Sequence, residues 1–328
     1  MLETVKYLMG SAGPSGYGSK STAEQVTESC GDLRSITAII TGATSGIGGE
    51  TARVLAKRGA RLILPARNPK AAEEAKALIL SECGLGDSHS RIIVMPLDLS
   101  SLASVTNFVA DFLALRLPLN LLINNAGKFS HEQAISEDGF EMTFATNYLG
   151  HFLLTKLLLK KMVETAKESG IEGRIVNVSS SIHSWLSGEI NPYLGNKSSQ
   201  YDATRAYAVS KLANVLHTKH LALVLQQMRA DVTVNCVHPG IVKTRLTRER
   251  EGLLTELGFF LGSKLLKTIP QAAATTCYVA THPSLLNVSG KYFADCNEAS
   301  ASKLGSNAAE AARLWSATQF MISRCLSP

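Results

Sequence analysis

The chain has 328 residues, of which 45% are hydrophobic and 18% are charged, and its formal net charge is +6. These proportions describe a globular protein with ample material for a core, and the length permits one large domain or two ordinary ones. The basic residues are spread along the chain, and their densest cluster, residues 244–251, also contains acidic residues. We therefore expect no nucleic-acid-binding surface.

The cysteine pattern and the hydropathy exclude further classes. The six cysteines are far apart and form no C-x-x-C pair, so we predict no disulfide framework, no metal site and a reducing compartment. No apolar run reaches the roughly 18 residues of a membrane-spanning helix, and we expect no transmembrane segment.

Residues 1–35 form an N-terminal extension before the first predicted strand. They lack the continuous apolar core of a secretory signal. Their first part is rich in Ser and Gly, which leaves a plastid-targeting role open, so the location is open between the cytoplasm and the chloroplast. Ser21-Thr-Ala-Glu24 has the spacing of a capping box and predicts a short helix.

A strand, a glycine turn, a helix and a second strand follow one another from residue 36. Ile36–Ile40 is short and apolar on both faces, as a buried parallel strand requires. The turn Thr41–Gly48 leads into an amphipathic helix that ends at Gly59, and Arg61–Leu64 is typical of a strand. This order predicts a βαβ unit with a right-handed crossover.

The alternation continues to the end of the chain. It predicts an α/β fold, a single doubly wound Rossmann domain over residues 36–328, with about seven parallel strands and helices on both faces. Further strands are predicted at Arg91–Met95, Leu119–Ile123, Arg174–Val178, Val232–Val237 and Lys291–Phe293, and helices at Lys70–Ser81, Leu102–Leu115, Gly139–Glu168, Ala203–Met228 and Gln271–Ala280.

Two long irregular segments, residues 181–204 and 244–270, each follow a strand at its carboxyl end. Ligands bind at that edge of doubly wound sheets, and long loops there often form lids. We predict that both line a substrate pocket. The second segment is also consistent with a surface helix docked on the core, or with one that contacts a membrane or a partner.

The glycine turn predicts a dinucleotide site. Gly42, Gly46 and Gly48 lie between a buried strand and a helix, where missing side chains let the backbone approach a pyrophosphate. Their spacing, G-x-x-x-G-x-G, differs from the commoner G-x-G-x-x-G, so the general fingerprint fits only loosely.

The end of the second predicted strand favours NADP(H). NAD-binding proteins often carry a carboxylate there, but this chain has Leu64-Pro-Ala-Arg67-Asn68. A guanidinium suits a 2′-phosphate. Arg67 could instead stack on the adenine or face solvent. Asp98, after the third strand, could accept a hydrogen bond from the adenine amino group or cap the following helix.

Tyr207 and Lys211 are four residues apart in a predicted helix and therefore share a face. A nearby cation favours the ionised form of a phenol, so the pair could exchange a proton with a substrate near neutral pH. Taken alone, the Y-x-x-x-K pattern is also that of an ordinary helix surface.

The order of motifs resembles that of short-chain dehydrogenases/reductases from about Thr37 to Asp295. The resemblance extends to the retinol-dehydrogenase-like branch and to the plant short-chain dehydrogenase of the chloroplast inner-envelope translocon, through phrases such as STAEQV, GRIVNVSS and PQAAATTCYVA. The motifs that carry the family resemblance are Thr41–Gly48, Asp98, Asn124–Gly127, Asn147, Ser180, Tyr207-x-x-x-Lys211 and Pro239-Gly240.

The resemblance implies a catalytic tetrad of Asn147, Ser180, Tyr207 and Lys211. Tyr207 would be the general acid or base, Lys211 would lower its pKa and hold the nicotinamide ribose, and Ser180 would bind the substrate oxygen. Asn147 would hold a water that completes a proton relay. The implied cofactor-binding residues are Gly42, Thr44, Ser45, Gly46, Ile47, Gly48, Arg67, Asn68, Asp98, Leu99, Asn125, Ala126, Gly127, Tyr207, Lys211, Pro239, Gly240, Val242 and Thr244.

The leading prediction is an NADPH-preferring oxidoreductase that interconverts a lipophilic ketone or aldehyde with its alcohol. Trp185, Phe259 and Phe260 in the two loops favour a lipophilic substrate, and the long helices offer faces for a homodimer. Lys128 departs from the family, which usually has an apolar residue after Asn-Asn-Ala-Gly. The alternative is an NADPH-sensing regulatory protein at a chloroplast envelope translocon, with calmodulin contact through residues 263–267 or 312–315.

Overall fold

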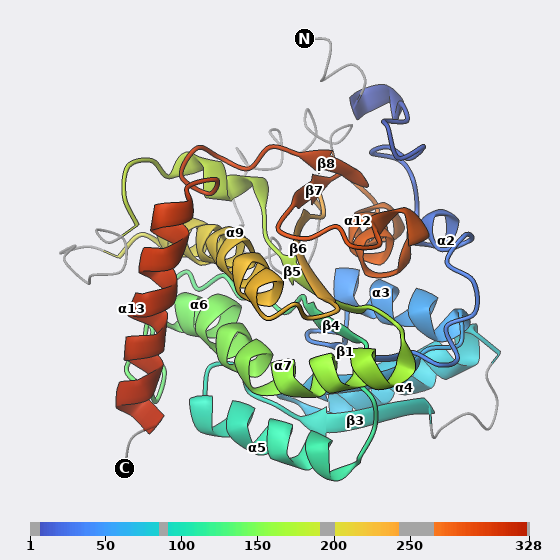
Figure 1. Ribbon diagram of the computed structural model, residues 1–328, viewed down its shortest axis with the longest axis horizontal. Coiled ribbons are helices and arrows are strands. Elements are labelled where there is room, and N and C mark those ends of the chain that lie inside the picture. Colours follow the sequence, from blue (N-terminus) through green and yellow to red (C-terminus); the bar gives the residue numbers. More distant parts are fainter. Residues whose placement is uncertain (1–6, 85–90, 191–200, 243–265, 327–328) are drawn as a thin grey trace.

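The computed structural model describes residues 7–84, 91–190, 201–242 and 266–326. Its centre is one eight-stranded sheet in the order β3-β2-β1-β4-β5-β6-β7-β8 (Figure 1). All neighbouring pairs are parallel except β7 and β8. The strands are β1 (Thr37–Ile40), β2 (Arg61–Ala66), β3 (Ile92–Pro96), β4 (Leu121–Asn124), β5 (Gly173–Val178), β6 (Val232–His238), β7 (Tyr292–Ala294) and β8 (Asn297–Ala299).

Helices cover both faces of the sheet, so the predicted doubly wound Rossmann fold is confirmed (Figure 1). One face carries α2 (Ala23–Val26), α3 (Gly46–Lys57), α4 (Pro69–Glu82) and α12 (Ile269–Thr281). The other carries α5 (Leu102–Ala114), α7 (Gly150–Ser169), α9 (Ala203–Gln227) and α13 (Ala308–Leu326). Short helical segments lie at α6 (Met142–Phe144), Ala145–Leu149, Ser181–Trp185 and Pro283–Leu285.

Strand residues alternate between the two cores because successive side chains point to opposite faces. In β1, Ile39 packs with the α5, α7 and α9 side, whereas Ala38 and Ile40 pack with the α3 and α12 side. All four residues of β1 are buried, as a central parallel strand requires.

The predicted helix over 139–168 is divided in the structure. Glu141 accepts hydrogen bonds from the backbone amides of Thr143 and Phe144, and this cap starts α6 at Met142. A π-helical segment, Ala145–Leu149, then separates α6 from α7. Such local π geometry is frequent at functional sites, and this one contains Asn147.

The eighth strand was absent from the sequence-based prediction. β7 and β8 pair through Ala294 and Asn297, so Asp295 and Cys296 form a two-residue hairpin turn. Both turn residues have positive φ, 51° and 63°, as a type I′ turn requires. Asp-Cys lacks the glycine that normally signals this turn, so the pattern did not reveal the hairpin.

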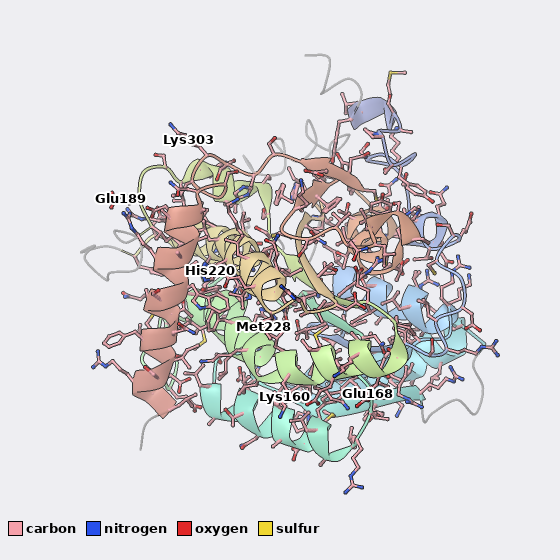
Figure 2. All side chains as sticks on the ribbon, viewed as in Figure 1. Lys160, Glu168, Glu189, His220, Met228 and Lys303 are labelled. Carbon is pink, nitrogen blue, oxygen red and sulfur yellow. The ribbon has the colours of Figure 1, made fainter. Side chains whose placement is uncertain are left out.

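Helix α13 was not among the predicted helices, although residues 312–315 within it were considered as a calmodulin-binding segment or a surface helix. It packs against α9 (Figure 1). Leu314 is completely buried, and the Tyr148 hydroxyl forms a 2.8 Å hydrogen bond with Thr318. The Trp315 ring stacks on His217 with 5.5 Å between centroids and lies 4.8 Å from His220, which Figure 2 shows on α9. The apolar face of α13 is therefore used inside the protein.

The predicted short N-terminal helix exists as α2, but its cap lies one residue later than expected. Thr22 and Gln25 form the capping box: Thr22 accepts from the Gln25 amide at 3.4 Å, and the Gln25 side chain accepts from the Thr22 amide at 2.9 Å. The predicted pair was Ser21 and Glu24. The Ser21 hydroxyl accepts a hydrogen bond from Gly18 instead.

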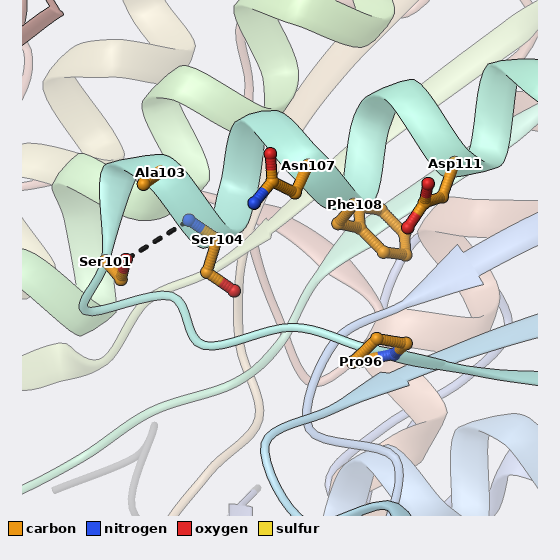
Figure 3. A pocket seen from close by; sticks show the side chains of 7 residues that line it. All are labelled: Pro96, Ser101, Ala103, Ser104, Asn107, Phe108 and Asp111. Atoms are coloured by element: carbon orange, nitrogen blue, oxygen red, sulfur yellow. Dashed lines mark hydrogen bonds between the residues drawn. The ribbon is translucent and has the colours of Figure 1, made fainter.

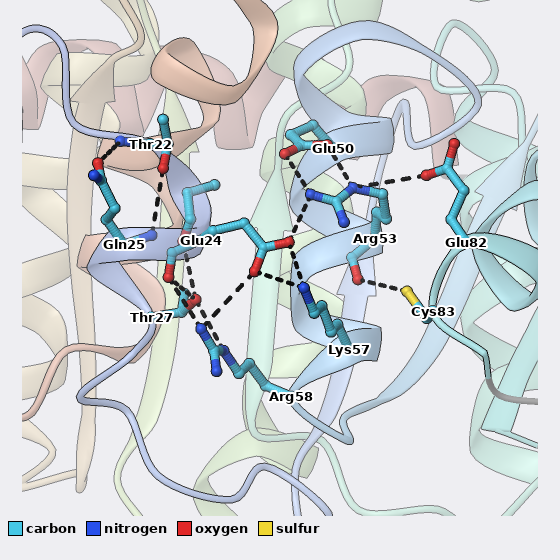
Figure 4. Close-up of polar contacts among 11 residues, drawn as sticks. Thr22, Glu24, Gln25, Thr27, Glu50, Arg53, Lys57, Arg58, Glu82 and Cys83 are labelled. Atoms are coloured by element: carbon cyan, nitrogen blue, oxygen red, sulfur yellow. Dashed lines mark hydrogen bonds and ion pairs between the residues drawn. The ribbon is translucent and has the colours of Figure 1, made fainter.

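Glu24 is used in ion pairs that join α2 to α3 (Figure 4). Its carboxylate lies 2.9 Å from Arg53 and 3.1 Å from Lys57, and Arg58 donates to its backbone carbonyl at 3.1 Å. Residues before α2 also contact the domain, because the Tyr17 ring lies edge-on to Tyr278 of α12. No helix in the described part of the chain combines the length and hydropathy needed to span a membrane.

Candidate active site

The turns after β1 and β4 meet where the strand order reverses. β1 lies between β2 and β4, so the glycine turn and residues 125–127 leave the sheet side by side at its carboxyl edge. Crevices of doubly wound sheets bind their ligands at this point.

Thr41 ties these two turns together. Its hydroxyl oxygen accepts hydrogen bonds from the amides of Asn125 and Ala126, both at 2.9 Å. The Asn125 side chain donates to the Thr41 carbonyl, also at 2.9 Å. Asn125 and Ala126, predicted to flank the adenosine, thus also hold the shape of the glycine turn.

Each glycine of the turn has a different steric role. A Cβ on Gly48 would lie 2.3 Å from the side-chain nitrogen Nδ2 of Asn125 and equally close to the backbone carbonyl oxygen of Gly42. Gly42 has φ +69°, and its Cβ would lie 2.8 Å from Ala126. Gly46 also has positive φ, but no described atom lies within 4 Å of its Cβ position. The backbone is therefore accessible at Gly46 and closely packed at the other two.

The N-terminus of α3 fits an anion. Thr44 and Ser45 are exposed, and the Ser45 hydroxyl makes no capping hydrogen bond to the helix. The first amides of a helix have no intrahelical acceptor, so those of Gly46, Ile47 and Gly48 suit a pyrophosphate.

The predicted adenosine end contains an exposed cation. Arg67 follows β2, is exposed and makes no hydrogen bond or ion pair within the described part of the chain. Asn68, predicted to bind the cofactor, caps α4 by accepting from the Ala71 amide at 3.2 Å. Its side chain therefore has at least one structural role.

Asp98 and Leu99 lie between β3 and α5. The Asp98 carboxylate accepts from the backbone and hydroxyl of Ser100, at 2.9 and 2.6 Å. Helix α5 is capped by Ser101, so the alternative role of Asp98 as its cap is wrong. The Leu99 carbonyl packs against Gly150, where a Cβ would approach it to 2.1 Å.

Tyr207 and Lys211 lie in the first half of α9 and share a face. The Lys211 ammonium lies 5.5 Å from the centre of the Tyr207 ring and donates a 3.0 Å hydrogen bond to the carbonyl of Val178. The ring of Phe129 lies 5.6 Å from that of Tyr207. Burial raises the pKa of Tyr207 to about 12 and lowers the pKa of Lys211 to about 8.

Asn147 is completely buried, and its side chain is fully engaged by its neighbours. Oδ1 accepts from the backbone amide of Lys128 at 2.7 Å, and Nδ2 donates to the Lys128 carbonyl at 2.9 Å and to the Ser210 hydroxyl at 3.0 Å. A Cβ on Gly127 would lie 3.9 Å from Asn147 and 3.6 Å from the Lys211 ammonium.

Ser180 follows β5 and begins the short helical turn 181–185, which packs against α9. Its hydroxyl accepts from the Ile182 amide at 3.4 Å. The neighbouring Ser179 donates to the Lys211 carbonyl at 2.7 Å, which fixes the end of β5 to α9. Tyr207 and Lys211 therefore come from α9, Asn147 from the π-helical segment and Ser180 from the residues after β5. Of these, Lys211 and Asn147 lie beside Gly127 of the β4 turn.

The family profile described as short chain dehydrogenase matches residues 36–252. The chain belongs to the short-chain dehydrogenase family. Members of this family are oxidoreductases with a nicotinamide cofactor, and the match spans more than half of the chain.

Relatives extend the similarity over almost the whole chain. The chain is 50% identical over 319 residues to short-chain dehydrogenase TIC 32 A, chloroplastic, of Brassica napus. This alignment covers 96% of the chain and 97% of the relative. The chain is 40% identical over 294 residues to retinol dehydrogenase 14 of Mus musculus, with coverage of 87% and 85%. Both branches of the resemblance predicted from the sequence are confirmed.

A solved structure supports the same fold. The crystal structure of an uncharacterized protein from Mycobacterium paratuberculosis matches with a TM-score of 0.70 and 28% identity. The comparison covers 91% of this short-chain dehydrogenase and 97% of the other chain.

The segment after β6 lies at the predicted nicotinamide end. Pro239 is buried, and Gly240 has φ +92°, with Lys267 methylenes packed where its Cβ would lie. Val242 pairs with Lys267, whose buried ammonium forms a 2.5 Å ion pair with Asp295. The predicted cofactor residue Thr244 lies outside the described residues, as do Phe259 and Phe260 of the predicted lid.

The first predicted pocket loop is described only at its two ends, 181–190 and 201–204. Trp185 is 73% exposed, so within the described residues it does not close over the site. A hollow of about 460 Å³ lies along α5, and none of the four predicted catalytic residues lines it (Figure 3). No group of three or more His, Cys, Asp or Glu side chains in the described ranges is arranged to hold a metal ion.

Sequence reasoning missed Ser179, Ser210 and His151 in this network, and it noted Lys128 for its side chain and not for its backbone. Ser179 and Ser210 bond to the backbone or side chain of tetrad members, and the Lys128 backbone holds Asn147. His151 bonds to both Thr41 and Asn147. The only signal in the sequence was that each of these residues lies next to a motif or within one helical turn of it. Many ordinary helix and loop residues lie equally close to a motif, so this signal does not reveal a contact.

Proposed function

We propose that this short-chain dehydrogenase is an NADPH-preferring oxidoreductase that interconverts a lipophilic ketone or aldehyde with its alcohol. The observation that carries the proposal is the grouping of Tyr207, Lys211 and Asn147 beside the β4 turn, with Ser180 following the end of β5 to which Lys211 bonds. The cofactor, when bound, supplies or accepts the hydride.

The protein manages the proton. A phenol with a pKa near 12 is protonated at neutral pH, so Tyr207 is ready to donate to an oxygen that gains negative charge. This differs from the expectation that Lys211 lowers the pKa of Tyr207, because burial has the larger effect in the free protein. The protonated phenol is the form that carbonyl reduction requires. Ser180 would add a second donor to the same oxygen, and Asn147 would hold a water that completes the proton relay.

The preference for NADPH rests on Arg67. It is exposed after β2, where the adenosine ribose lies in this fold, and the strand end carries no carboxylate. A guanidinium forms charge-assisted hydrogen bonds to a phosphate. NAD has no 2′-phosphate, so it would give Arg67 no such partner. The N-terminus of α3 would hold the pyrophosphate, with Asn125–Gly127, Pro239, Gly240 and Lys211 along the rest of the cofactor.

The substrate class rests on apolar residues at the site and on the relatives. Phe129 packs beside Tyr207, and Trp185 and Ile241, the latter 53% exposed, follow Ser180 and Gly240. The relative that is 40% identical is named as a retinol dehydrogenase. We therefore choose all-trans-retinal as the first carbonyl probe.

The test is the oxidation of NADPH by the purified protein with all-trans-retinal. The Tyr207→Phe variant should lower kcat by about a hundredfold or more while it retains NADPH binding. Tyr278→Phe is the control, because its hydroxyl bonds to Ser284 on the α12 side. Equal turnover by the wild type and Tyr207→Phe would contradict the mechanism.

A second candidate is an NADPH-sensing regulatory protein at the chloroplast envelope. It is favoured by the 50% identity to a relative named as chloroplastic, which also favours a chloroplast location. Neither predicted calmodulin segment is a free basic helix in its described part, since Lys267 is buried in an ion pair and Leu314 is buried against the core. Pull-down from chloroplast envelopes with and without NADPH tests this candidate, and the absence of any partner in both samples would exclude it.

A further inference from the structure

His151 lies in the first turn of α7, and only 3% of its surface is exposed. Its Nε2 lies 2.8 Å from the Thr41 hydroxyl oxygen, and its Nδ1 lies 3.1 Å from the Asn147 carbonyl oxygen. Thr41 opens the glycine turn, and Asn147 lies in the π-helical segment before α7. The ring therefore joins the cofactor turn to the segment that carries a predicted catalytic residue.

The chemistry of the two partners fixes the direction of both hydrogen bonds. A carbonyl oxygen can only accept, so Nδ1 must carry a hydrogen and donate it to Asn147. Burial lowers the pKa of His151 to about 4, so the ring is neutral at pH 7 and its Nε2 is an acceptor. The Thr41 hydroxyl therefore donates to His151 at 2.8 Å, the nearer of its two acceptors, since the Ile123 carbonyl lies at 3.4 Å. Its oxygen accepts from the amides of Asn125 and Ala126.

The connection continues from Asn147 to the catalytic helix. The Asn147 side chain donates to Ser210, and Ser210 donates to the carbonyl oxygen of Tyr207 at 2.7 Å. A continuous series of hydrogen bonds, buried as far as Ser210, thus leads from Thr41 through His151 and Asn147 to the turn of α9 that holds Tyr207. Thr41 and His151 are 110 residues apart, so only the folded chain brings these groups together.

We propose that His151 is a positioning residue that holds the cofactor turn at a fixed distance from the proton-transfer residues. This inference rests on the proposed oxidoreductase function. It assigns His151 no contact with substrate or cofactor, because the bonds described for its ring nitrogens go to Thr41 and Asn147. Its effect would be on the chemical step, since hydride transfer depends on the alignment of the cofactor with the bound carbonyl.

The chain offers a matched control in His217. It is also fully buried, on α9, but neither of its ring nitrogens has a hydrogen-bond partner in the described structure. His217 therefore fills space without a polar link to the site. If His151 were only filling space, replacement of either ring by leucine should have similar effects on turnover.

The kinetic test compares His151→Leu, His151→Asn and His217→Leu with NADPH and all-trans-retinal. His151→Leu should lower kcat by about tenfold or more with little change in the KM for retinal, because a small misplacement affects the chemical step. His151→Asn keeps a donor near the position of Nδ1 but has no acceptor within reach of Thr41, so the link stays broken and kcat should remain well below that of the wild type. His217→Leu should have the kcat of the wild type. A wild-type kcat for a folded His151→Leu or a folded His151→Asn would overturn the proposal.

A second measurement does not depend on turnover. In ¹⁵N-histidine-labelled protein at pH 7, the His151 ring should be the neutral tautomer with hydrogen on Nδ1, assigned by the signals lost in His151→Asn. A ring with hydrogen on Nε2, or a cationic ring, would refute the hydrogen-bond series even if the enzyme is active. Failure of the wild type to reduce retinal, with the Nδ1–H tautomer present, would count against the proposed substrate and leave the positioning link supported.

Discussion

The ammonium group of Lys211 donates a 3.0 Å hydrogen bond to the carbonyl oxygen of Val178, the last residue of β5. The next residue, Ser179, donates its hydroxyl back to the carbonyl of Lys211 at 2.7 Å. These two bonds fix α9 to the strand end from which Ser180 emerges. Tyr207, one turn earlier in α9, thereby has a fixed place relative to Ser180. One of the three ammonium hydrogens is used, which leaves donors for the proposed ribose contact.

The lowered pKa of Lys211 predicts the pH dependence of carbonyl reduction. Below its pKa of about 8 the ammonium is charged and stabilises negative charge on the nearby phenol and substrate oxygen. Above this pH the charge is lost, so kcat/KM should be constant on the acid side of about pH 8 and fall on the alkaline side. The profile of kcat/KM reports groups of the free enzyme and is the right measurement.

The control for that profile is Lys128→Met. The backbone of Lys128 holds Asn147, but the Lys128 side chain has no described bond to the tetrad. Removal of that side chain's charge should therefore leave the pH at which kcat/KM falls unchanged. A profile that stays flat well beyond about pH 8 in the wild type would show that Lys211 does not control the rate.

Two adjacent glycines in α3 should respond very differently to alanine. In Gly48→Ala the new Cβ would approach Asn125 and Gly42 to 2.3 Å, so the turn must open and lose its fit to the pyrophosphate. We expect NADPH affinity to fall by about tenfold or more, since the bound geometry depends on this close approach. Gly49→Ala meets only the Ala43 carbonyl at 3.4 Å and should bind NADPH normally, with up to about 1 kcal/mol of added stability. Titration of NADPH fluorescence compares them, and equal affinities would rule out this role of Gly48.

The sequence correctly predicted those parts of the fold and the site that local residue pattern and spacing determine. Seven of the strands, the glycine turn and the helix with Tyr207 follow from apolar periodicity and glycine positions. The β8 strand did not, because Asp295 and Cys296 adopt positive φ without the usual glycine. The predicted cap of α2 was one residue too early. Ser21 and Thr22 both carry a hydroxyl that can accept from a nearby backbone amide, so the sequence does not show which of them caps the helix.

Hydrogen bonds between residues far apart in the chain could not be predicted from the local sequence pattern. Nothing around His151 in the sequence distinguishes it from an ordinary helix residue, and its role depends on a contact with Thr41 across the sheet. The pKa of Tyr207 was also unpredictable. The i, i+4 pairing with Lys211 was correct, but the degree of burial, which decides the direction of the shift, is a property of the folded chain.

Arg67 should determine the choice between NADPH and NADH. Arg67→Ala removes a charge-assisted bond to the 2′-phosphate, and we expect the Kd for NADPH to rise by about tenfold to a hundredfold. The Kd for NADH should change little, because that cofactor has no phosphate at this position. Lys160→Ala is the control, since Lys160 is 89% exposed on α7. A parallel loss of affinity for both cofactors in Arg67→Ala would contradict a specific phosphate contact.

Helix α13 should contribute to global stability. Leu314 is completely buried in the core that α13 shares with α7 and α9, so Leu314→Ala should lower the free energy of unfolding by about 2–5 kcal/mol. Phe320→Ala, at a side chain that is 64% exposed on the same helix, should stay within about 0.5 kcal/mol of the wild type. Urea unfolding measures both. Equal and small effects would mean that α13 detaches without loss of the core.

The buried histidine His217 should make the protein acid-sensitive. Burial, with smaller effects from His220 and His151, lowers the pKa of His217 to about 3, whereas an unfolded histidine titrates near 6.5. The unfolded state therefore binds a proton first as the pH falls. The contribution of the neutral ring to stability is complete above about pH 6.5 and decreases below it, by about 3 kcal/mol at about pH 4. His217→Leu has no ring to protonate, so its free energy of unfolding should fall less between about pH 7 and pH 4 than that of the wild type. Urea titrations at the two pH values give this difference. An identical loss in the wild type and in His217→Leu would assign the acid sensitivity to other groups, such as the half-buried His238, whose pKa is also lowered to about 4, mainly by its partial loss of hydration.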